Sequence, residues 1–256
     1  MVLRGLLAIL TLILTVCLVT ISGCKPSSSR EVLRIAAASN QAVVLREIVD
    51  RWEEKTGHKA DLITGSSGRL TAQISEGAPF DVFLAADHIY TDRLLDDGHI
   101  LDSISTYAFG KLALIGRNIQ GDISEIISTS TRLAIANPEI APYGKASIVY
   151  LDGLALSEDW TSKLAYAENV AQVHQSVYTG AAEIGITALG LLKHSSDEDV
   201  LKWKAIDGSY KPVEQLLAIV KSSHLVQVSS SFRSFLLSSE GRAILSSYGY
   251  DTTSAR

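Results

Sequence analysis

The stretch that decides the fold is residues 32–57, VLRIAAASNQAVVLREIVDRWEEKTG. It opens with the apolar run Val32–Ala37, which predicts a buried strand. From Ala42 onward, apolar residues recur at the spacing of one helix face, and Gly57 ends that pattern. The stretch therefore predicts a strand that passes directly into a helix through the small residues Ala38-Ser39-Asn40.

The following segments repeat this order of strand and helix. The predicted elements are the strand Lys59–Thr64, the helix Leu70–Ser75, the strand Asp81–Ala85 and the helix Ile89–Leu95. Consecutive β-α-β units indicate parallel strands in one sheet, with helices packed against its faces.

Two long extended runs, Tyr107–Ile115 and Pro212–Val220, bracket about 100 residues of further strand and helix patterns. The later candidates are strands at Arg132–Ala136, Leu164–Ala167, Glu183–Thr187 and Val200–Ile206, and helices at Ser229–Leu237 and Gly241–Tyr248. The two long runs predict two crossings between two α/β lobes with a cleft between them. We expect each lobe to be a mixed sheet flanked by helices, the first from residues 32–108 plus 221–256 and the second from residues 109–220.

A secretory signal is predicted for residues 1–23, which contain one charged residue, Arg4, and the apolar run Gly5–Val19. The residues Ile21-Ser22-Gly23-Cys24 resemble the lipobox of bacterial lipoproteins, whose cysteine is diacylated and becomes the first residue. This resemblance implies a lipid on Cys24, a tether over residues 24–31, and an exported protein anchored to the outer face of the cytoplasmic membrane. The alternative is an uncleaved signal anchor, for which the apolar run is slightly short.

The composition argues against several classes of protein. The formal net charge is −5, and removal of Arg4 with the signal makes it one unit more negative. Nucleic-acid binding requires clustered Lys and Arg, so this acidic chain is a poor candidate. Cys17 leaves with the signal, so Cys24 stays without a disulfide partner in the chain. The histidines are scattered without metal-ligand spacing.

Four junctions of small, uncharged residues connect predicted strands to predicted helices. They are Ala38-Ser39-Asn40, Gly65-Ser66-Ser67-Gly68, Ala141-Pro142-Tyr143-Gly144 and Asn169-Val170. The start of a helix leaves N–H groups without intrahelical partners and carries a partial positive charge, so it binds anions without Lys or Arg. Four converging starts would surround a small oxyanion, whereas any one junction alone is more simply a helix cap.

Several motifs carry a resemblance to a known family. They are Ala36–Asn40 (AAASN), Gly77–Asp87 (GAPFDVFLAAD), Asn137–Gly144 (NPEIAPYG) and, near the C-terminus, Gly241–Leu245 with Tyr248-Gly249-Tyr250. From about Leu33 to Tyr250 the chain resembles the molybdate-binding proteins of ABC transporters. The resemblance implies a periplasmic-binding-protein fold of type II-like topology, with two lobes that close around molybdate or tungstate.

The resemblance also implies site residues and partners. Ser39 and Ser67 would donate hydroxyls, the N–H groups of Ser67, Tyr143 and Val170 would donate as well, and Asn40 matches one branch of the family. The implied partners are an ABC permease and its ATPase. We expect a monomer without cofactor or catalytic residue, which holds the metal as its oxyanion and not through direct protein ligands.

Two positions leave alternatives open. Many relatives place a tyrosine hydroxyl on the anion where this chain has Ala188. Arg69 lies one residue beyond Gly68, and a guanidinium that reached the ligand would favour a carboxylate or phosphate. The main alternative is therefore a binding protein for sulfate, phosphate or a carboxylate.

Two further classes have less support. A hydrolase is disfavoured because the G-x-S-x-G spacing is absent around Ser67. A ligand-sensing transcription regulator with similar lobes is disfavoured by the export signal and the acidic charge. Asp81 and Asp87 are interpreted as residues at a strand end and a helix start, not as ligands.

Overall fold

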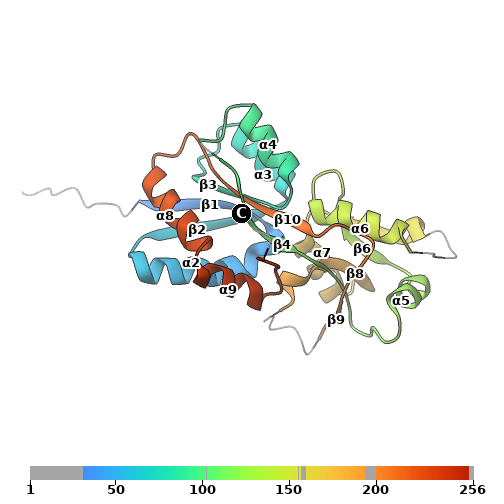
Figure 1. Cartoon of the computed structure of the whole chain (residues 1–256). Helices are drawn as coiled ribbons and strands as arrows, with labels where there is room; N and C mark the ends of the chain where they lie inside the picture. The colour runs from blue at the N-terminus through green and yellow to red at the C-terminus, as the bar shows by residue number, and fades with distance from the viewer. Residues whose placement is uncertain (1–30, 102, 155, 157–159, 194–199, 254–256) are drawn as a thin grey trace, which may run out of the picture. The chain divides into compact units, whose positions relative to one another are not determined.

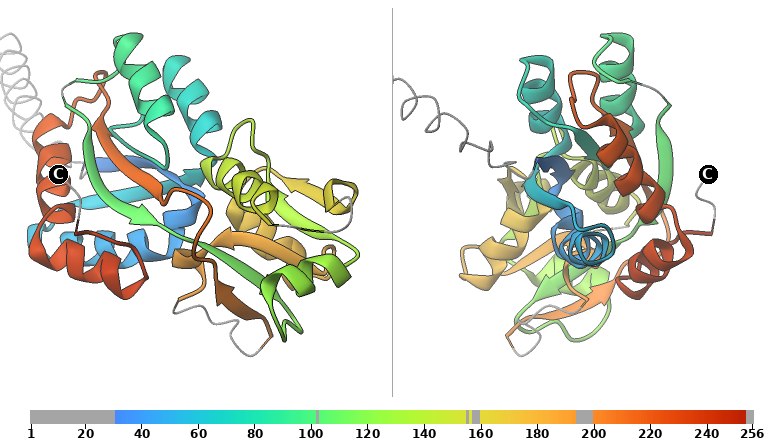
Figure 2. Two further views of the ribbon diagram at one scale, coloured as in Figure 1. Left: turned by 45° about the vertical axis from the view of Figure 1, so that its right-hand side comes forward. Right: turned by 90° about the vertical axis from the view of Figure 1, so that its left-hand side faces the viewer.

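Two five-stranded sheets organise the part of the chain that the computed structural model describes, which is residues 31–253 except 102, 155, 157–159 and 194–199. The strand order is β2-β1-β3-β10-β4 in the first sheet and β7-β6-β8-β5-β9 in the second. Helices cover the faces of both sheets (Figures 1 and 2). The predicted two-lobed α/β fold with mixed sheets is confirmed. The predicted signal peptide and the lipidation site Cys24 lie outside the described residues.

The first sheet combines parallel and antiparallel pairing. Its strands are β1 (Val32–Ala38), β2 (Lys59–Gly65), β3 (Val82–Ala85), β4 (Ser105–Gly110) and β10 (Val213–Ile219). β1 pairs in parallel with β2 and β3, whereas β10 runs antiparallel to β3 and β4. The helices of this lobe are α2 (Ala42–Thr56), preceded by the 3-10 turn η1 (Ser39–Gln41), α3 (Ser67–Ser75), α4 (His88–Asp96), α8 (Val226–Leu236) and α9 (Ser239–Ser247).

The alternation of side chains along β1 explains why both faces of this sheet are covered. Leu33 and Ile35 pack in the core formed with α2, α8 and α9, whereas Ala36 packs in the core formed with α3 and α4. Successive side chains of a strand point to opposite faces, so an unbroken apolar run requires apolar partners on both sides. In Figure 1, α3 and α4 lie on one side of the sheet and α2 and α9 on the other.

The second sheet has the same arrangement of pairing. Its strands are β5 (Leu112–Gly116), β6 (Leu133–Ala136), β7 (Leu164–Ala167), β8 (Ile184–Ala188) and β9 (Lys202–Ala205). β6 pairs in parallel with β7 and β8, whereas β5 runs antiparallel to β8 and β9. The remaining elements are the helices α5 (Ile123–Thr129), α6 (Pro142–Asp152) and α7 (Val170–Tyr178) and the 3-10 turns η2 (Trp160–Lys163) and η3 (Leu189–Leu191).

The chain crosses between the sheets at the two extended runs, but both predicted boundaries of the second lobe, 109 and 220, are wrong. Val213–Ile219 forms β10 of the first sheet, not part of the second lobe, and Phe109 and Gly110 also pair in the first sheet. An apolar run indicates a strand without indicating its partners. Here the antiparallel pairing of β10 between β3 and β4 decides the sheet, through register pairs such as Leu216↔Ala85 and Val213↔Gly110.

Val32–Arg256 forms one compact unit. Among its described helices, none is both long enough and apolar enough to span a membrane.

Candidate functional site

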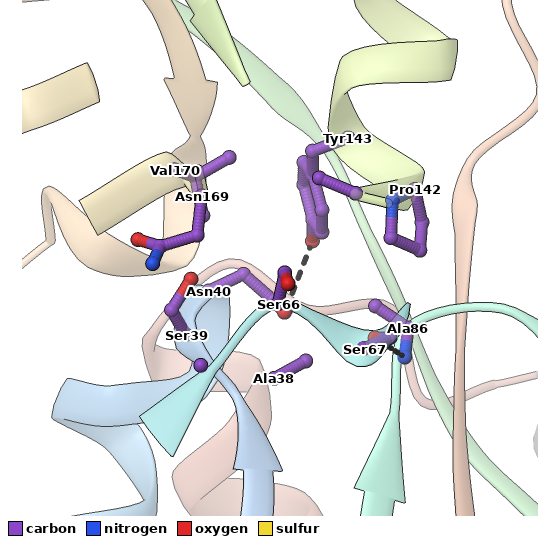
Figure 3. A pocket seen from close by; sticks show the side chains of 12 residues that line it. Ala38, Ser39, Asn40, Ser66, Ser67, Ala86, Pro142, Tyr143, Asn169 and Val170 are labelled. Atoms are coloured by element: carbon purple, nitrogen blue, oxygen red, sulfur yellow. Dashed lines mark hydrogen bonds between the residues drawn. The ribbon is translucent and has the colours of Figure 1, made fainter. Parts of the chain in front are cut away.

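The four small-residue junctions lie around one cavity (Figure 3). β1 and β2 pair in parallel up to Ala38↔Gly65, so the residues that follow these strands emerge side by side. β6 and β7 do the same in the second sheet, where Ala136 pairs with Ala167. The carboxyl ends of parallel strands are the edge where α/β sheets bind ligands. The lining residues are Ala38, Ser39, Asn40, Gly65, Ser66, Ser67, Ala86, Ala141, Pro142, Tyr143, Asn169 and Val170.

The cavity is small and its lining carries no charge. About 210 Å³ of it is free of protein atoms, part of this space being open to solvent. Only about 10 Å³ of this space can hold the centre of a water-sized sphere, so the cavity has no room for a drug-sized ligand, whose sites usually exceed about 300 Å³. None of the described lining residues is acidic, basic or a histidine. The cavity therefore suits a ligand of a few heavy atoms that is recognised by neutral hydrogen-bonding groups.

Ser67 presents two donors to this cavity. The Ser67 Oγ accepts a hydrogen bond of 3.1 Å from the Ala86 N–H, so its own hydroxyl hydrogen is left to donate elsewhere. At the start of α3, the N–H groups of Gly68, Arg69 and Leu70 bond to Ile140 O, Ser66 Oγ and Ser66 O. The Ser67 N–H has no acceptor among the described residues. It is the free donor of this helix start.

The start of α6 leaves one N–H free in the same way. Ala141 O accepts from the N–H groups of Gly144, at 2.9 Å, and of Lys145, at 3.2 Å. Pro142 has no N–H, so the first-turn donor without a protein acceptor in the described chain is that of Tyr143.

The start of α7 repeats this pattern. Asn169 Oδ1 caps the N–H groups of Ala171 (3.0 Å) and Gln172 (3.1 Å), and Asn169 O accepts from Val173. The Val170 N–H is left without an acceptor in the described part of the chain. Helices from both lobes thus offer single free N–H groups at the cavity, at Ser67, Tyr143 and Val170, the residues whose N–H groups the family resemblance implies as donors.

Ser39 and Asn40 differ in how their side chains are used. Ser39 is buried, and its hydroxyl has no hydrogen-bond partner among the described residues, so it is free to donate. The Asn40 Nδ2 lies 2.7 Å from Gln215 Oε1 and 3.2 Å from both Tyr143 Oη and Tyr250 Oη. Its two hydrogens are already shared among three acceptors. The Asn40 side chain is therefore committed to the protein, although the residue lines the cavity.

A buried polar network behind the cavity was missed by the sequence reasoning. Besides Asn40, it contains Gln41 and Gln215, joined by a bond of 2.7 Å from Gln41 Nε2 to Gln215 Oε1, and Tyr107, which donates to Gln41 Oε1. Burial raises the pKa of Tyr107, Tyr143 and Tyr250 well above that of a free tyrosine. These phenols therefore remain protonated at neutral pH. Asn40, Tyr143 and Tyr250 stand in motifs that carry the family resemblance, whereas no sequence signal pointed to Gln41 or Gln215.

The remaining residues singled out from the sequence lie outside the cavity. Arg69 is exposed and places one guanidinium nitrogen 3.0 Å from both carboxylate oxygens of Glu168, at the start of the second lobe's α7. Ala188 is fully buried at the end of β8 and does not line the cavity. Asp81 accepts from the Arg34 N–H, and Asp87 caps α4 through the Ile89 N–H. Both carboxylates are structural, as expected.

The two lobes contact each other beside the cavity. The Gly68 N–H donates to Ile140 O of the second lobe at 3.1 Å. The next residue of the first lobe, Arg69, forms an ion pair with Glu168 of the second lobe. The Lys145 ammonium of α6 lies 5.7 Å from the centre of the Tyr90 ring of α4. The cleft is therefore closed in this structure. The described residues contain no group of three or more potential metal ligands.

Comparisons with known proteins agree with this geometry. The family described as bacterial extracellular solute-binding protein matches residues 33–251. The molybdate-binding protein ModA of Azotobacter vinelandii is 33% identical over 224 residues, which cover 85% of this chain and 89% of that protein. The ModA protein of Rhodobacter capsulatus is 32% identical over 231 residues, covering 89% and 90%.

A solved structure extends the comparison to three dimensions. The periplasmic molybdate-binding protein of Azotobacter vinelandii superposes with a TM-score of 0.80 at 30% identity, over 85% of this chain and 98% of that one. The resemblance predicted from the sequence motifs is thus confirmed along most of the chain.

Proposed function

Because the chain belongs to the bacterial extracellular solute-binding proteins, we propose that it captures molybdate or tungstate outside the cytoplasmic membrane and delivers the anion to an ABC importer. The observation that carries this proposal is the convergence of four uncharged junctions on one small cavity. Each free N–H or hydroxyl at the cavity is a donor, and a tetrahedral dianion offers only acceptors.

The donors are sufficient for tight binding without a salt bridge. They are the hydroxyls of Ser39 and Ser67 and the N–H groups of Ser67, Tyr143 and Val170, with Asn40 supporting the first junction. A hydrogen bond to a charged group contributes about 1.5 to 3 kcal/mol. Several such bonds offset the cost of removing a small dianion from water, and the positive ends of α3, α6 and α7 add to them.

The lack of acidic side chains among the described lining residues favours molybdate over phosphate. Molybdate and tungstate are fully deprotonated near neutral pH, whereas hydrogen phosphate retains a proton that requires an acceptor such as a carboxylate. No acidic side chain is among the described lining residues. Arg69, whose guanidinium would favour phosphate or a carboxylate, is engaged with Glu168. These contacts support molybdate and tungstate against the alternative anions.

The same lining argues against catalysis. A serine nucleophile needs a base within hydrogen-bond reach, and no acidic, lysine or histidine side chain is among the described residues that line the cavity with Ser67. We propose a binding protein without enzymatic activity or cofactor. It acts as a monomer whose closed form is recognised by a permease and its ATPase.

The binding proposal is tested by thermal unfolding of the purified protein with equal concentrations of molybdate, tungstate, sulfate and phosphate. A ligand held only by the folded protein raises the melting temperature by mass action. We expect molybdate and tungstate to raise it most. A larger shift with sulfate or phosphate would contradict the proposal and would direct attention to Arg69.

We also propose that Cys24 is lipidated, which holds the exported protein at the outer face of the membrane. Two acyl chains give stable anchoring where one does not. In cells fed a labelled fatty acid, the wild-type protein should carry the label and sediment with membranes, and the Cys24→Ala variant should remain unprocessed and unlabelled. A wild-type protein that is unlabelled and fractionates as soluble would contradict this part of the proposal.

A further inference from the structure

Tyr250, near the C-terminus, lies at the crossing between the two lobes although it does not line the cavity. Its ring is buried, with 4% of the residue exposed. A methyl group added at Gly190, in η3 of the second lobe, would lie 2.4 Å from Tyr250 Cε2, and one added at Gly110, at the end of β4, would lie 3.3 Å from Tyr250 Cε1. The ring therefore occupies the space between the second lobe and the strand that connects it to the first.

The backbone fixes this position without help from a ligand. Asp251 and Phe109 of β4 exchange two hydrogen bonds, with N···O distances of 2.8 and 2.9 Å, and the Tyr250 N–H donates to Leu245 O at the end of α9. The segment that carries Tyr250 is thus held on the first lobe. The Tyr250 side chain reaches from there to the second lobe.

The Tyr250 hydroxyl contacts Asn40 of the proposed anion site from two directions. It donates to Asn40 O at 2.8 Å and lies 3.2 Å from Asn40 Nδ2, from which it accepts. Asn40 Nδ2 also reaches Tyr143 Oη, whose residue supplies a free N–H from the second lobe. Tyr250 therefore connects the first junction, at η1, with the third, at α6.

This arrangement bears on the size of the anion that fits. Donors that sit on two lobes have a fixed spacing only if the lobes stop closing at a fixed point. The buried Tyr250 provides such a stop because protein interiors resist compression: its hydroxyl is bonded to Asn40 and also lies against Gly190, where an added methyl group would come within 2.6 Å of the hydroxyl oxygen.

We propose that Tyr250 is a positioning residue that fixes Asn40 and the closing distance of the lobes, and so determines the size of tetrahedral anion that the cavity accepts. The inference rests on the proposed function. Loss of the Tyr250 hydroxyl releases the Asn40 backbone and lets the lobes close further. A smaller anion such as sulfate then finds more of the donors within bonding distance.

The test compares Tyr250→Phe with Tyr248→Phe, which removes a hydroxyl bonded to Glu47 on the outer side of the first lobe. Affinities of both variants and of the wild type for molybdate, tungstate, sulfate and phosphate are measured by calorimetry on the full mature protein. For Tyr250→Phe we expect molybdate affinity to fall about five- to tenfold, the amount that one net hydrogen bond is worth. We also expect the ratio of molybdate to sulfate affinity to fall by at least about threefold, with no change in that ratio for Tyr248→Phe.

A second variant separates positioning from loss of stability. Gly190→Ala leaves every hydroxyl in place but adds a methyl group against the Tyr250 ring, which holds the lobes further apart, so the ratio of molybdate to sulfate affinity should rise instead of falling. If the wild type discriminates between the anions and neither Tyr250→Phe nor Gly190→Ala changes the ratio relative to Tyr248→Phe, the positioning role is wrong while the proposed function stands. If the wild type binds none of the four anions, both are wrong.

Discussion

Ser67 shows how a neutral side chain is oriented as a donor. A hydroxyl can donate or accept, but the Ala86 N–H already occupies an acceptor site on Ser67 Oγ. The hydroxyl hydrogen and the Ser67 N–H then both remain for the cavity. Whether a residue of the cavity can donate to the anion therefore depends on which of its own atoms are already bonded to the protein.

We expect Ser67→Ala and Ser39→Ala each to weaken molybdate binding by about ten- to a hundredfold, because a hydroxyl bonded to a buried dianion is worth about 1.5 to 3 kcal/mol. The control is Ser75→Ala, which removes from the same helix, α3, a buried hydroxyl that has no partner among the described residues. Calorimetric titration of the three variants measures the effect. Unchanged affinity in both site variants would remove these serines from the site.

The residues of the cavity were predictable where local sequence determines the geometry. Ser39, Ser67, Tyr143 and Val170 follow strands and begin helices, and that order alone predicts free N–H groups. The partner of Ser67, Ala86, and the bonds of Asn40 to Gln215 and Tyr250 depend on strands far apart in the chain. Nothing in the local pattern around an alanine or a glutamine indicates such a role.

The elements that form the cavity converge because of strand order. β1 and β2 end together, β6 and β7 end together, and the helices that follow bring their N-termini to one point. The sequence predicted these units because each is continuous in the chain. It did not predict that β10 joins the first sheet, because antiparallel pairing with β3 and β4 brings together residues more than 100 positions apart.

The ion pair between Arg69 of α3 and Glu168, at the start of α7, should help to hold the two lobes closed. The Arg69 and Glu168 side chains are 59% and 28% exposed, so the pair contributes no more than about 0.2 to 1 kcal/mol. We expect Glu168→Gln to raise the rate of molybdate release by up to about fivefold and to make that rate less sensitive to salt. Glu54→Gln, which breaks the exposed Arg51–Glu54 pair within α2, is the matched control.

Stopped-flow measurements of anion release at low and high salt report the release rate and its dependence on salt. Equal release rates for Glu168→Gln and Glu54→Gln at every salt concentration would show that the Arg69–Glu168 pair has no part in closure.

The whole molecule has a net negative charge yet is proposed to concentrate a dianion. The formal charge is −5, so the long-range field opposes binding. The interactions that favour anion binding must therefore be local. They come from the helix starts and the fixed donors around a small, closed cavity. Screening of the negative charge by salt should therefore raise the association rate of the anion slightly or leave that rate unchanged.

The buried tyrosines predict how the stability of the whole molecule depends on pH. Burial raises the pKa of Tyr107, Tyr143 and Tyr250 in the folded state, and burial with Glu47 raises that of Tyr248 to about 12. The folded state then holds protons that the unfolded state releases above its own tyrosine pKa of about 10. The contribution of the protonated tyrosines to the free energy of unfolding is fully present below pH 10. It is lost as the pH rises toward the pKa values of these tyrosines in the folded state.

We expect the free energy of unfolding to decline above pH 10 by up to about 1.4 kcal/mol per pH unit for each such tyrosine. Urea unfolding at a series of pH values measures the decline. Tyr107→Phe should make it shallower, whereas Tyr166→Phe, which removes an exposed hydroxyl, should not. A stability that is constant to pH 12 would contradict the burial of these phenols.

The most direct test of the central claim is a calorimetric titration of the ligand-free mature protein with molybdate, tungstate, sulfate and phosphate. Donors spaced for a larger anion leave several of their hydrogens unpaired around a smaller one, and each unpaired buried donor costs about 1 to 3 kcal/mol. We predict one site, similar affinities for molybdate and tungstate, sulfate weaker by at least about a hundredfold, and almost no binding of phosphate. Sulfate or phosphate binding as tightly as molybdate would contradict the account.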